Sequence, residues 1–230
     1  MNLLAFDTST EALSAAVMRD GHIAAEESAA GGALASAALI PTLQALLARA
    51  GVALADLDAI VFGRGPGSFT GLRTACAVAQ GLAFGARVPV LGIDTLLAVA
   101  EEARARSGAV RVVAVLDARM NEVYAARYRH DVGGWQREGA IVLASPAAVE
   151  VPRDWVLAGN AFAGYGAQLP SHAPRIEALP TAAAMLRLAP QLLAAGQAVD
   201  AAHAMPVYIR DKVAQTTEER AAARAPAAAR

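Results

Sequence analysis

LLAFDTST, residues 3–10, and VVAVLDARMNEVY, residues 112–124, follow one pattern at two places in this 230-residue chain. In each copy a short apolar run is closed by an aspartate, Asp7 or Asp117, and a polar turn leads into a second apolar stretch. A turn such as RDG (residues 19–21), a typical hairpin signal, then leads into a third stretch. Each copy therefore predicts a strand-turn-strand-turn-strand unit.

A β-β-β unit that occurs twice, each time followed by helices, resembles the duplicated fold of the actin, sugar kinase and Hsp70 group. This resemblance implies an α/β, ribonuclease-H-like fold of two lobes, whose Asp-bearing turns face each other across a cleft. We place the first lobe at residues 1–106 and the second at 107–216, with the last helices belonging to the second lobe or returning to the first. Residues 217–230, which end in RAAARAPAAAR, are of low complexity and are predicted to be a mobile tail.

The other elements follow from local pattern. Apolar residues at helical spacing predict a helix over residues 34–49, which either begins late or bends because Pro41 removes one backbone donor. Ser68 suits the N-cap of a helix that runs to about Gly85. The remaining predicted elements are strands at 57–62 and 88–93, helices at 95–106 and 181–195, and a short ordered segment at 205–213.

Composition excludes several classes of protein. Hydrophobic residues make up 56% of the chain, but no run of about 18 uninterrupted apolar residues occurs, so no membrane-spanning helix is expected. The start MNLLAFD lacks the basic lead-in of a signal peptide, and we expect a cytoplasmic protein. A net charge of −1 and 5% aromatic residues argue against a protein that grips nucleic acid by itself. The single cysteine, Cys76, rules out an intramolecular disulfide.

The stretch GRGPGSFTGLR, residues 63–73, is the most informative motif. A tight turn that aims backbone N–H groups at a helix start can hold an anion, and its candidate contacts are Arg64, Gly65, Gly67 and Ser68. It is neither a phosphate-binding Walker loop nor a dinucleotide fingerprint, because no Gly-Lys-Ser/Thr follows and a proline falls inside it. The alternative is a strand-to-helix turn whose glycines only permit the bend.

The helix after this turn is rich in small residues, which allow another helix to come close. Either it packs tightly on its own sheet, or it forms a subunit interface together with the helix at 34–49. The candidate interface residues are Leu39, Leu43, Leu46, Thr70, Arg73, Thr74, Ala77, Val78 and Gly81. Arg64 and Arg73 flank the glycine turn and could contact a nucleotide at such an interface, or could be solvated or paired with carboxylates.

Four motifs together resemble the TsaB (YeaZ) family. They are FGRGPGSFTGLR (62–73), the opening LLAFDTST, LDARMNEVY (116–124) and PVYIRDKVA (206–214). The resemblance covers nearly the whole chain and implies a dimerisation subunit for the synthesis of threonylcarbamoyladenosine in tRNA. It further implies a heterodimer with the catalytic subunit TsaD, association with the ATPase TsaE, and a homodimer through the same N-terminal lobe when the protein is alone.

Chemistry by the chain itself has little support in the sequence. Asp7 and Asp117 could share a cation or could cap their own turns, and neither turn has a glycine through which the backbone could approach a pyrophosphate. The histidines lie far apart, so no i, i+4 metal-binding pair exists; they are His22, His130, His172 and His203. We therefore expect no catalytic residue, no metal and no cofactor.

The leading hypothesis is a non-catalytic scaffold of the tRNA N6-adenosine threonylcarbamoyltransferase complex. Its helices at 34–49 and 70–85 would dock on TsaD and order that partner's active site, with tRNA bound only through the complex. On this hypothesis Ala79→Arg should abolish heterodimerisation and leave the fold intact. The alternative is an independent ATP-dependent small-molecule kinase or ATPase of the same fold.

Overall fold

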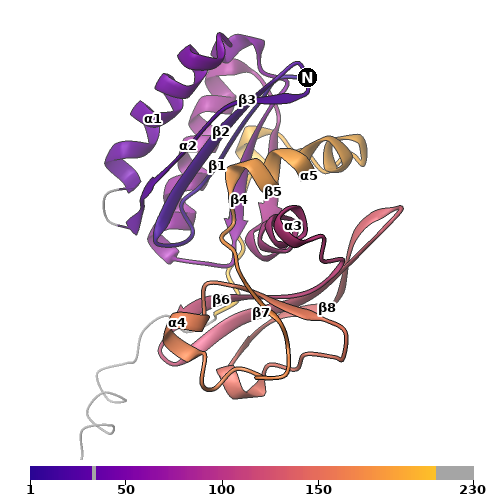
Figure 1. The fold of residues 1–230 in the computed structure, drawn as a ribbon. Coiled ribbons are helices and arrows are strands. Elements are labelled where there is room, and N and C mark those ends of the chain that lie inside the picture. Colours follow the sequence, from indigo (N-terminus) through magenta and orange to yellow (C-terminus); the bar gives the residue numbers. More distant parts are fainter. Residues whose placement is uncertain (33–34, 211–230) are drawn as a thin grey trace, which may run out of the picture.

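Each copy of the repeat builds a five-stranded mixed sheet in the computed structural model, which describes residues 1–32 and 35–210 (Figure 1). The first sheet has the order β3-β2-β1-β4-β5, and the second has the matching order β8-β7-β6-β9-β10 when read from its other edge. In both, an antiparallel three-stranded meander is extended by two parallel strands. The predicted duplication is therefore confirmed.

The first sheet contains β1 (Leu3–Asp7), β2 (Ala12–Arg19), β3 (His22–Ala30), β4 (Ala59–Gly65) and β5 (Val90–Asp94). The second contains β6 (Arg111–Arg119), β7 (Glu122–Asp131), β8 (Gly134–Ala144), β9 (Val156–Gly159) and β10 (Arg175–Glu177). β9 and β10 have only four and three residues, too few to establish a periodic pattern, and the sequence did not predict them.

Helices cover the two sheets. They are α1 (Ala35–Ala50), α2 (Phe69–Ala86), α3 (Thr95–Ser107), α4 (Phe162–Tyr165) and α5 (Ala182–Ala194), with short 3-10 turns η2 (Leu54–Asp56), η3 (Pro146–Ala148) and η4 (Ala201–His203). Ser68 caps α2 as predicted, since its side chain accepts a hydrogen bond from the Gly71 N–H. Pro41 lies inside α1, so that helix does not begin late.

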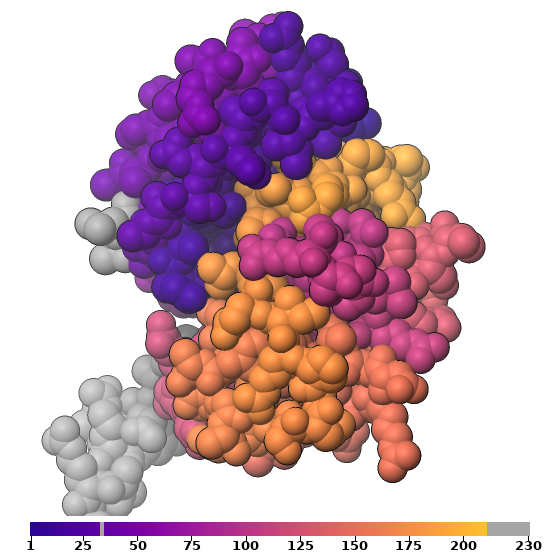
Figure 2. Space-filling model, in the orientation of Figure 1, coloured from indigo at the N-terminus to yellow at the C-terminus, as the bar shows by residue number. Residues whose placement is uncertain are grey.

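The central strands β1, β2 and β4 of the first sheet are buried on both faces because helices cover both sides of them, whereas the edge strand β3 is mostly exposed. On β1, Leu4 and Phe6 join the core under α1 and α2, whereas Leu3 and Ala5 join a second core that contains Met185 of α5. α5, although it follows the second sheet in sequence, therefore packs on the first sheet. Figure 2 shows this part of the chain, in yellow, between the indigo first lobe and the magenta-to-orange second lobe.

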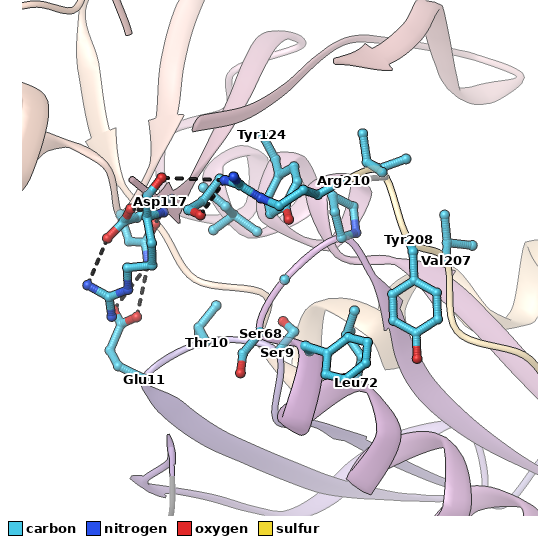
Figure 3. Close-up of a pocket in the computed structure, with 18 of the residues that line it drawn as sticks. Ser9, Thr10, Glu11, Ser68, Leu72, Asp117, Tyr124, Val207, Tyr208 and Arg210 are labelled. Carbon is cyan, nitrogen blue, oxygen red and sulfur yellow. Dashed lines mark hydrogen bonds and ion pairs between the residues drawn. The ribbon is translucent and has the colours of Figure 1, made fainter. Parts of the chain in front are cut away.

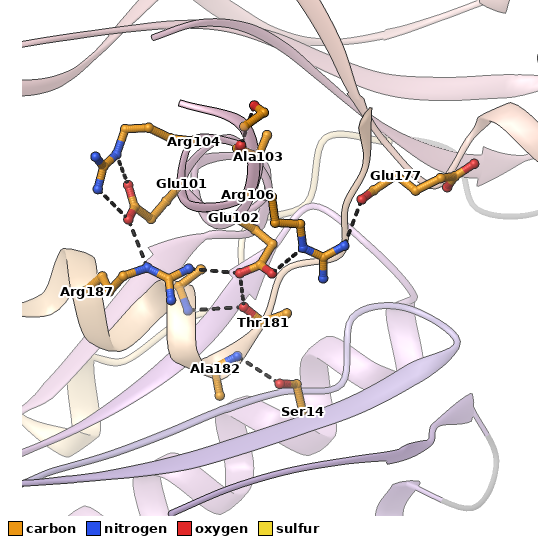
Figure 4. A network of polar contacts seen from close by, with 12 residues as sticks. Ser14, Glu101, Glu102, Ala103, Arg104, Arg106, Glu177, Thr181, Ala182 and Arg187 are labelled. Carbon is orange, nitrogen blue, oxygen red and sulfur yellow. Dashed lines mark hydrogen bonds and ion pairs between the residues drawn. The ribbon is translucent and has the colours of Figure 1, made fainter. Parts of the chain in front are cut away.

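A polar network joins α3, α5 and the second sheet (Figure 4). The buried carboxylate of Glu101 accepts hydrogen bonds from Arg104 (2.8 Å), Arg187 of α5 (3.0 Å) and the Trp135 indole of β8 (3.0 Å). Burial alone would raise the pKa of Glu101, but these hydrogen bonds outweigh burial and hold the pKa below its ordinary value. Glu101 is therefore ionised and fixes the two lobes against each other.

The neighbouring Glu102 repeats this arrangement toward the first sheet. It accepts hydrogen bonds from Arg106 (2.7 Å), Arg187 (2.8 Å) and the hydroxyl of Thr181 (2.8 Å), which is also the N-cap of α5. One residue further, the Ala182 N–H donates to a buried serine of β2. The start of α5 is thus fixed by polar contacts on both of its sides.

Removing one charge from this network should destabilise the chain. Glu101→Gln leaves Arg104 without its carboxylate and Arg187 with Glu102 alone, and we expect the free energy of unfolding in urea to fall by about 2 kcal/mol, a value reduced for the partial exposure of both guanidinium groups. Glu138→Gln is the control, because Glu138 meets Arg129 at 3.6 Å on the surface. Its effect should stay within about 0.5 kcal/mol; equal losses in the two variants would contradict the role given to Glu101.

Two predicted segments fall partly or wholly beyond residue 210. The predicted mobile tail at 217–230, and the last part of the ordered segment predicted at 205–213, lie outside the described residues. Among the helices that are described, none is both long and apolar enough to cross a membrane.

Candidate functional site

The glycine motif packs on the first Asp-bearing turn. The Thr8 hydroxyl donates to the Gly71 carbonyl (2.7 Å), and the Ser68 N–H donates to the Ser9 carbonyl (2.7 Å). A Cβ at Gly71 would fall on the Thr8 carbonyl oxygen, and one at Gly67 would lie 2.6 Å from the Ser9 side chain. These two glycines are therefore required so that the start of α2 can approach the turn. Neither the anion-binding interpretation of the motif nor the interpretation as a simple bend included this reason.

Asp7 is buried at the end of β1. Its Oδ1 accepts hydrogen bonds from the N–H (2.9 Å) and the hydroxyl (2.7 Å) of Ser9, so the carboxylate caps its own turn as the sequence favoured. Its Oδ2 has no hydrogen-bond partner among the described residues. Burial raises the pKa of Asp7 from 3.8 to about 7, and the hydrogen bonds from Ser9 offset only part of this rise. Asp7 does not line the cavity described below.

Asp117, its counterpart at the β6–β7 turn, is held differently. Its Oδ1 accepts from the Arg119 N–H (2.7 Å) and the Tyr165 hydroxyl (3.0 Å), and its Oδ2 pairs with the Arg119 guanidinium (3.0 Å). Here too the capping interpretation is confirmed. Three successive residues of the turn, Arg119 to Asn121, have positive φ angles of 62°, 56° and 59°. None of the three is a glycine, so three side chains project where a phosphate-binding hairpin would expose backbone.

A cavity of about 730 Å³ lies between the two turns (Figure 3). Hydroxyl groups of Ser9, Thr10 and Ser68 line it from the first lobe, and Tyr124 lines it from the second. Glu11 and Asp117 lie at one end of the view in Figure 3, and Tyr208 lies at the other. The cavity thus has an acidic end and an aromatic end.

The four predicted anion contacts are separated in the structure. Gly67 and Ser68 line the cavity, but Arg64 and Gly65 do not. Arg64 is paired with Asp94 at 2.7 Å. Gly65 is buried under the carbonyl of Val207, which would lie 2.5 Å from a Cβ there. Arg64 and Gly65 therefore lie apart from this cavity, and the contact of all four residues with an anion at a subunit interface stays a prediction.

Residues 204–210, which we call the strap, close one side of the cavity. The Gln80 amide donates to the Ala204 carbonyl (2.9 Å), and the Val207 N–H donates to the Arg64 carbonyl (2.7 Å). At the far end Arg210 pairs with Glu122 of the second lobe at 2.8 Å. The strap therefore runs from the first lobe to the second.

The sequence alone did not assign a role to the residues at either side of the cavity. The motif PVYIR in the strap indicated only the family. That the strap crosses from one lobe to the other follows from contacts between residues far apart in the sequence. On the acidic side the Asn160 amide donates to Glu11 (3.0 Å), again between lobes. Asn160 directly follows the unpredicted strand β9, so no local pattern pointed to it.

The predicted interface leucines are buried in the chain's own core. Leu39, Leu43 and Leu46 lie between α1 and the first sheet and are at most 1% exposed. They were wrong as interface residues, because apolar spacing along a helix marks the face that packs on its own sheet. Ala79 is likewise fully buried, so Ala79→Arg would disrupt the fold and is not a test of docking. Cys76 is a small packed residue, as expected.

The other predicted interface residues lie on the outer side of α2. Thr70, Arg73, Ala77 and Gly81 are exposed, whereas Thr74 and Val78 are partly exposed. These positions are three or four residues apart and therefore share one face of the helix. The adjacent α1 exposes Ala37, Ile40, Pro41, Ala45 and Ala48.

This outer face of α1 and α2 is almost without charge. α1 has one charged residue in 16, Arg49, and α2 has one in 18, Arg73. Two large apolar side chains are exposed on it, Ile40 at 45% and Phe84 at 82%. Surface helices ordinarily carry charged residues on the solvent side, and an uncharged apolar face is typical of a protein contact.

Comparison with known proteins gives consistent results. Residues 33–150 match the family model described as TsaD: tRNA N6-adenosine threonylcarbamoyltransferase. The chain is 38% identical over 225 residues to the tRNA threonylcarbamoyladenosine biosynthesis protein TsaB of Escherichia coli (strain K12), covering 93% of this chain and 96% of the relative. The TsaB of Haemophilus influenzae is 36% identical, with 93% and 95% covered.

A solved structure agrees with these relatives. YeaZ from Pseudomonas aeruginosa matches with a TM-score of 0.84 and 42% identity, covering 90% of this chain and 99% of that one. The likeness thus extends through both lobes. The sequence identities, 36% to 42%, are higher than similarity of fold alone would need. The chain belongs to the TsaB (YeaZ) family of tRNA threonylcarbamoyladenosine biosynthesis proteins.

Proposed function

We propose that the chain is the non-catalytic scaffold subunit of the machinery that forms N6-threonylcarbamoyladenosine in tRNA. The relatives are named for this biosynthesis, and the matching family model is that of the transferase itself. In the proposed complex, TsaD carries out the transfer, TsaE supplies ATPase activity, and tRNA binds through the complex in the cytoplasm.

The outer face of α1 and α2, whose charged residues are Arg49 and Arg73, carries this proposal. It combines small side chains, which allow close helix approach, with the exposed Ile40 and Phe84. We assign TsaD to this face, since residues 33–150, which match the TsaD family model, include both helices. A second copy of the chain would use the same face when TsaD is absent, so homodimer and heterodimer would exclude each other.

The alternative of an independent kinase is less well supported by the cavity. Its two turns expose side chains instead of glycine backbone, and Asp117 is already paired with Arg119. The charged lining of the cavity is mixed, with Glu11 and Asp117 beside three arginines, and two of these, Arg119 and Arg210, are already paired with carboxylates of this chain.

Reconstitution with purified TsaD tests the proposal. We expect an equimolar mixture to elute from size-exclusion chromatography as a heterodimer, with and without ATP. We also expect TsaD to modify tRNA, in the presence of TsaE and the threonylcarbamoyl donor, at least about tenfold faster when this chain is added. The isolated chain should turn over no ATP; strong ATP hydrolysis or phosphotransfer by the chain alone would favour the kinase alternative.

A further inference from the structure

Three side chains form a cluster at the start of the outer face of α2. The Arg73 guanidinium lies over the Phe69 ring, 3.9 Å from its centroid, and its Nε donates to the Tyr208 hydroxyl at 3.2 Å. The two aromatic rings are 5.4 Å apart. Although they touch each other, Phe69 is 39% exposed and Tyr208 is 45% exposed. We call these three residues the anchor cluster.

The cluster is held in place before any partner binds. Tyr208 belongs to the strap, which is fixed by Gln80 and Arg64 on the first lobe and through Arg210 to the second. Stacking on Phe69 and the hydrogen bond to Tyr208 restrict the Arg73 side chain. A long side chain that is already ordered loses less conformational entropy when it binds.

Within residues 1–32 and 35–210, Arg73 has unused donors and pairs with no carboxylate. A guanidinium has five N–H groups, and only Nε of Arg73 has a partner among the described residues. In contrast, Arg64, Arg104, Arg187 and Arg210 each pair with a carboxylate of this chain. Arg73 is also the only charge on α2. Its free terminal N–H groups match the geometry of a carboxylate, which two parallel hydrogen bonds can hold.

The cluster and the apolar face are continuous. Arg73, Ala77 and Gly81 follow each other at intervals of four residues and thus lie in one row along α2. The row continues to Phe84, so it extends over about 16 Å of helix. One partner surface can therefore cover the small residues and reach Arg73 at the end.

Building on the docking proposed above, we infer that the anchor cluster is the polar hot spot of the docking face and binds a carboxylate side chain of the TsaD subunit. Arginine, tyrosine and other aromatic residues dominate the energetics of protein interfaces when neighbouring contacts exclude water from them. The apolar row beside Arg73 would provide that exclusion. The cluster also lines one end of the cavity, whose other arginines, Arg119 and Arg210, are already paired with carboxylates of this chain. A protein carboxylate is favoured over a ligand phosphate because Arg73 lies on the exposed face of α2, in line with Ala77 and Gly81 of the docking face.

Isothermal titration of purified TsaD into variants of the full chain tests this inference. We expect Arg73→Ala to weaken the dissociation constant by a factor of about 30 and Arg73→Lys to recover only part of the loss, because an ammonium cannot form the planar fork. Arg73→Glu should bind more weakly than Arg73→Ala, and the gap between them should shrink between about 50 and 300 mM salt. Arg111→Ala, an exposed arginine of the second lobe, should change binding less than twofold.

The outcomes separate the two proposals. If Arg73→Ala binds TsaD as the unmodified chain does while Gly81→Arg fails to bind, the role of the anchor cluster is contradicted and the docking face is supported. Equal affinities of Arg73→Glu and Arg73→Ala for TsaD at low salt would contradict a carboxylate as the partner of Arg73. If Arg73→Ala instead loses ADP or ATP binding by the isolated chain with unchanged affinity for TsaD, the cluster serves the cavity and the inference fails. Absence of TsaD binding by the unmodified chain would remove both proposals.

Discussion

Gly81→Arg should abolish the binding of TsaD while leaving the fold intact. Gly81 lies on the exposed face of α2, and a Cβ added there meets no atom within 4 Å. Arginine is also a better helix former than glycine, by about 0.7 kcal/mol, so the melting temperature should stay the same or rise. In the complex, however, a guanidinium would be buried without a partner in an apolar contact. That penalty, at least about 3 kcal/mol, corresponds to a loss of more than 100-fold in affinity.

Two variants make this result specific. Gly81→Ala adds only a methyl group and should bind TsaD within about threefold of the unmodified chain, with a slightly higher melting temperature. Ala79→Arg, two residues away but buried, should lower the melting temperature or prevent folding, because its side chain would enter the core. Full binding by Gly81→Arg in titration calorimetry would place the TsaD contact on another surface.

Asp7→Asn should stabilise the chain strongly at neutral and alkaline pH. The folded chain keeps Asp7 protonated until its pKa of about 7, whereas the unfolded chain releases this proton near 3.8. A raised pKa in the folded state means that stability is lost as the pH rises, by about 1.4 kcal/mol per pH unit between these two values. Above pH 7 the total cost is on the order of 4 kcal/mol. Asparagine keeps an oxygen for Ser9 and removes this cost.

Urea denaturation at several pH values measures the effect. The difference in unfolding free energy between Asp7→Asn and the unmodified chain should be near zero at pH 4, grow through pH 5 and 6, and level off above pH 7. Asp117→Asn is the matched control from the second copy. It loses an ion pair with Arg119 and should not stabilise the chain at pH 8. A difference for Asp7→Asn that stays constant with pH would contradict the buried, uncharged state of Asp7.

The duplicated fold could be predicted from sequence because its evidence is local and occurs twice. β1 to β3 and β6 to β8 combine short apolar runs with turn signals, and Ser68 marks the start of α2. β9 and β10 could not be predicted, since each is too short to show a period and is a strand only because β6 or β9 lies beside it. The same applies to α5, whose pattern predicts a helix but not which sheet it covers.

The candidate site was likewise predictable only where its evidence is local in the sequence. Small residues on α2 indicated close packing, but sequence could not tell which face packs inward, and that choice separates the exposed Ala77 and Gly81 from the buried Ala79. In a helix with little charge, small and apolar residues recur at the same spacing on the buried face and on the exposed face. The anchor cluster joins Arg73 to Tyr208, 135 positions apart, and only the folded chain brings them together.

The return of α5 to the first sheet also constrains the order in which the chain can fold during its synthesis. Leu3 and Ala5 emerge from the ribosome first, yet the helix that covers them is encoded by residues 182–194. Until that helix has been translated, one side of the N-terminal sheet remains exposed to water as an apolar surface. Folding of the first lobe is therefore completed only after nearly all of the second lobe has been made.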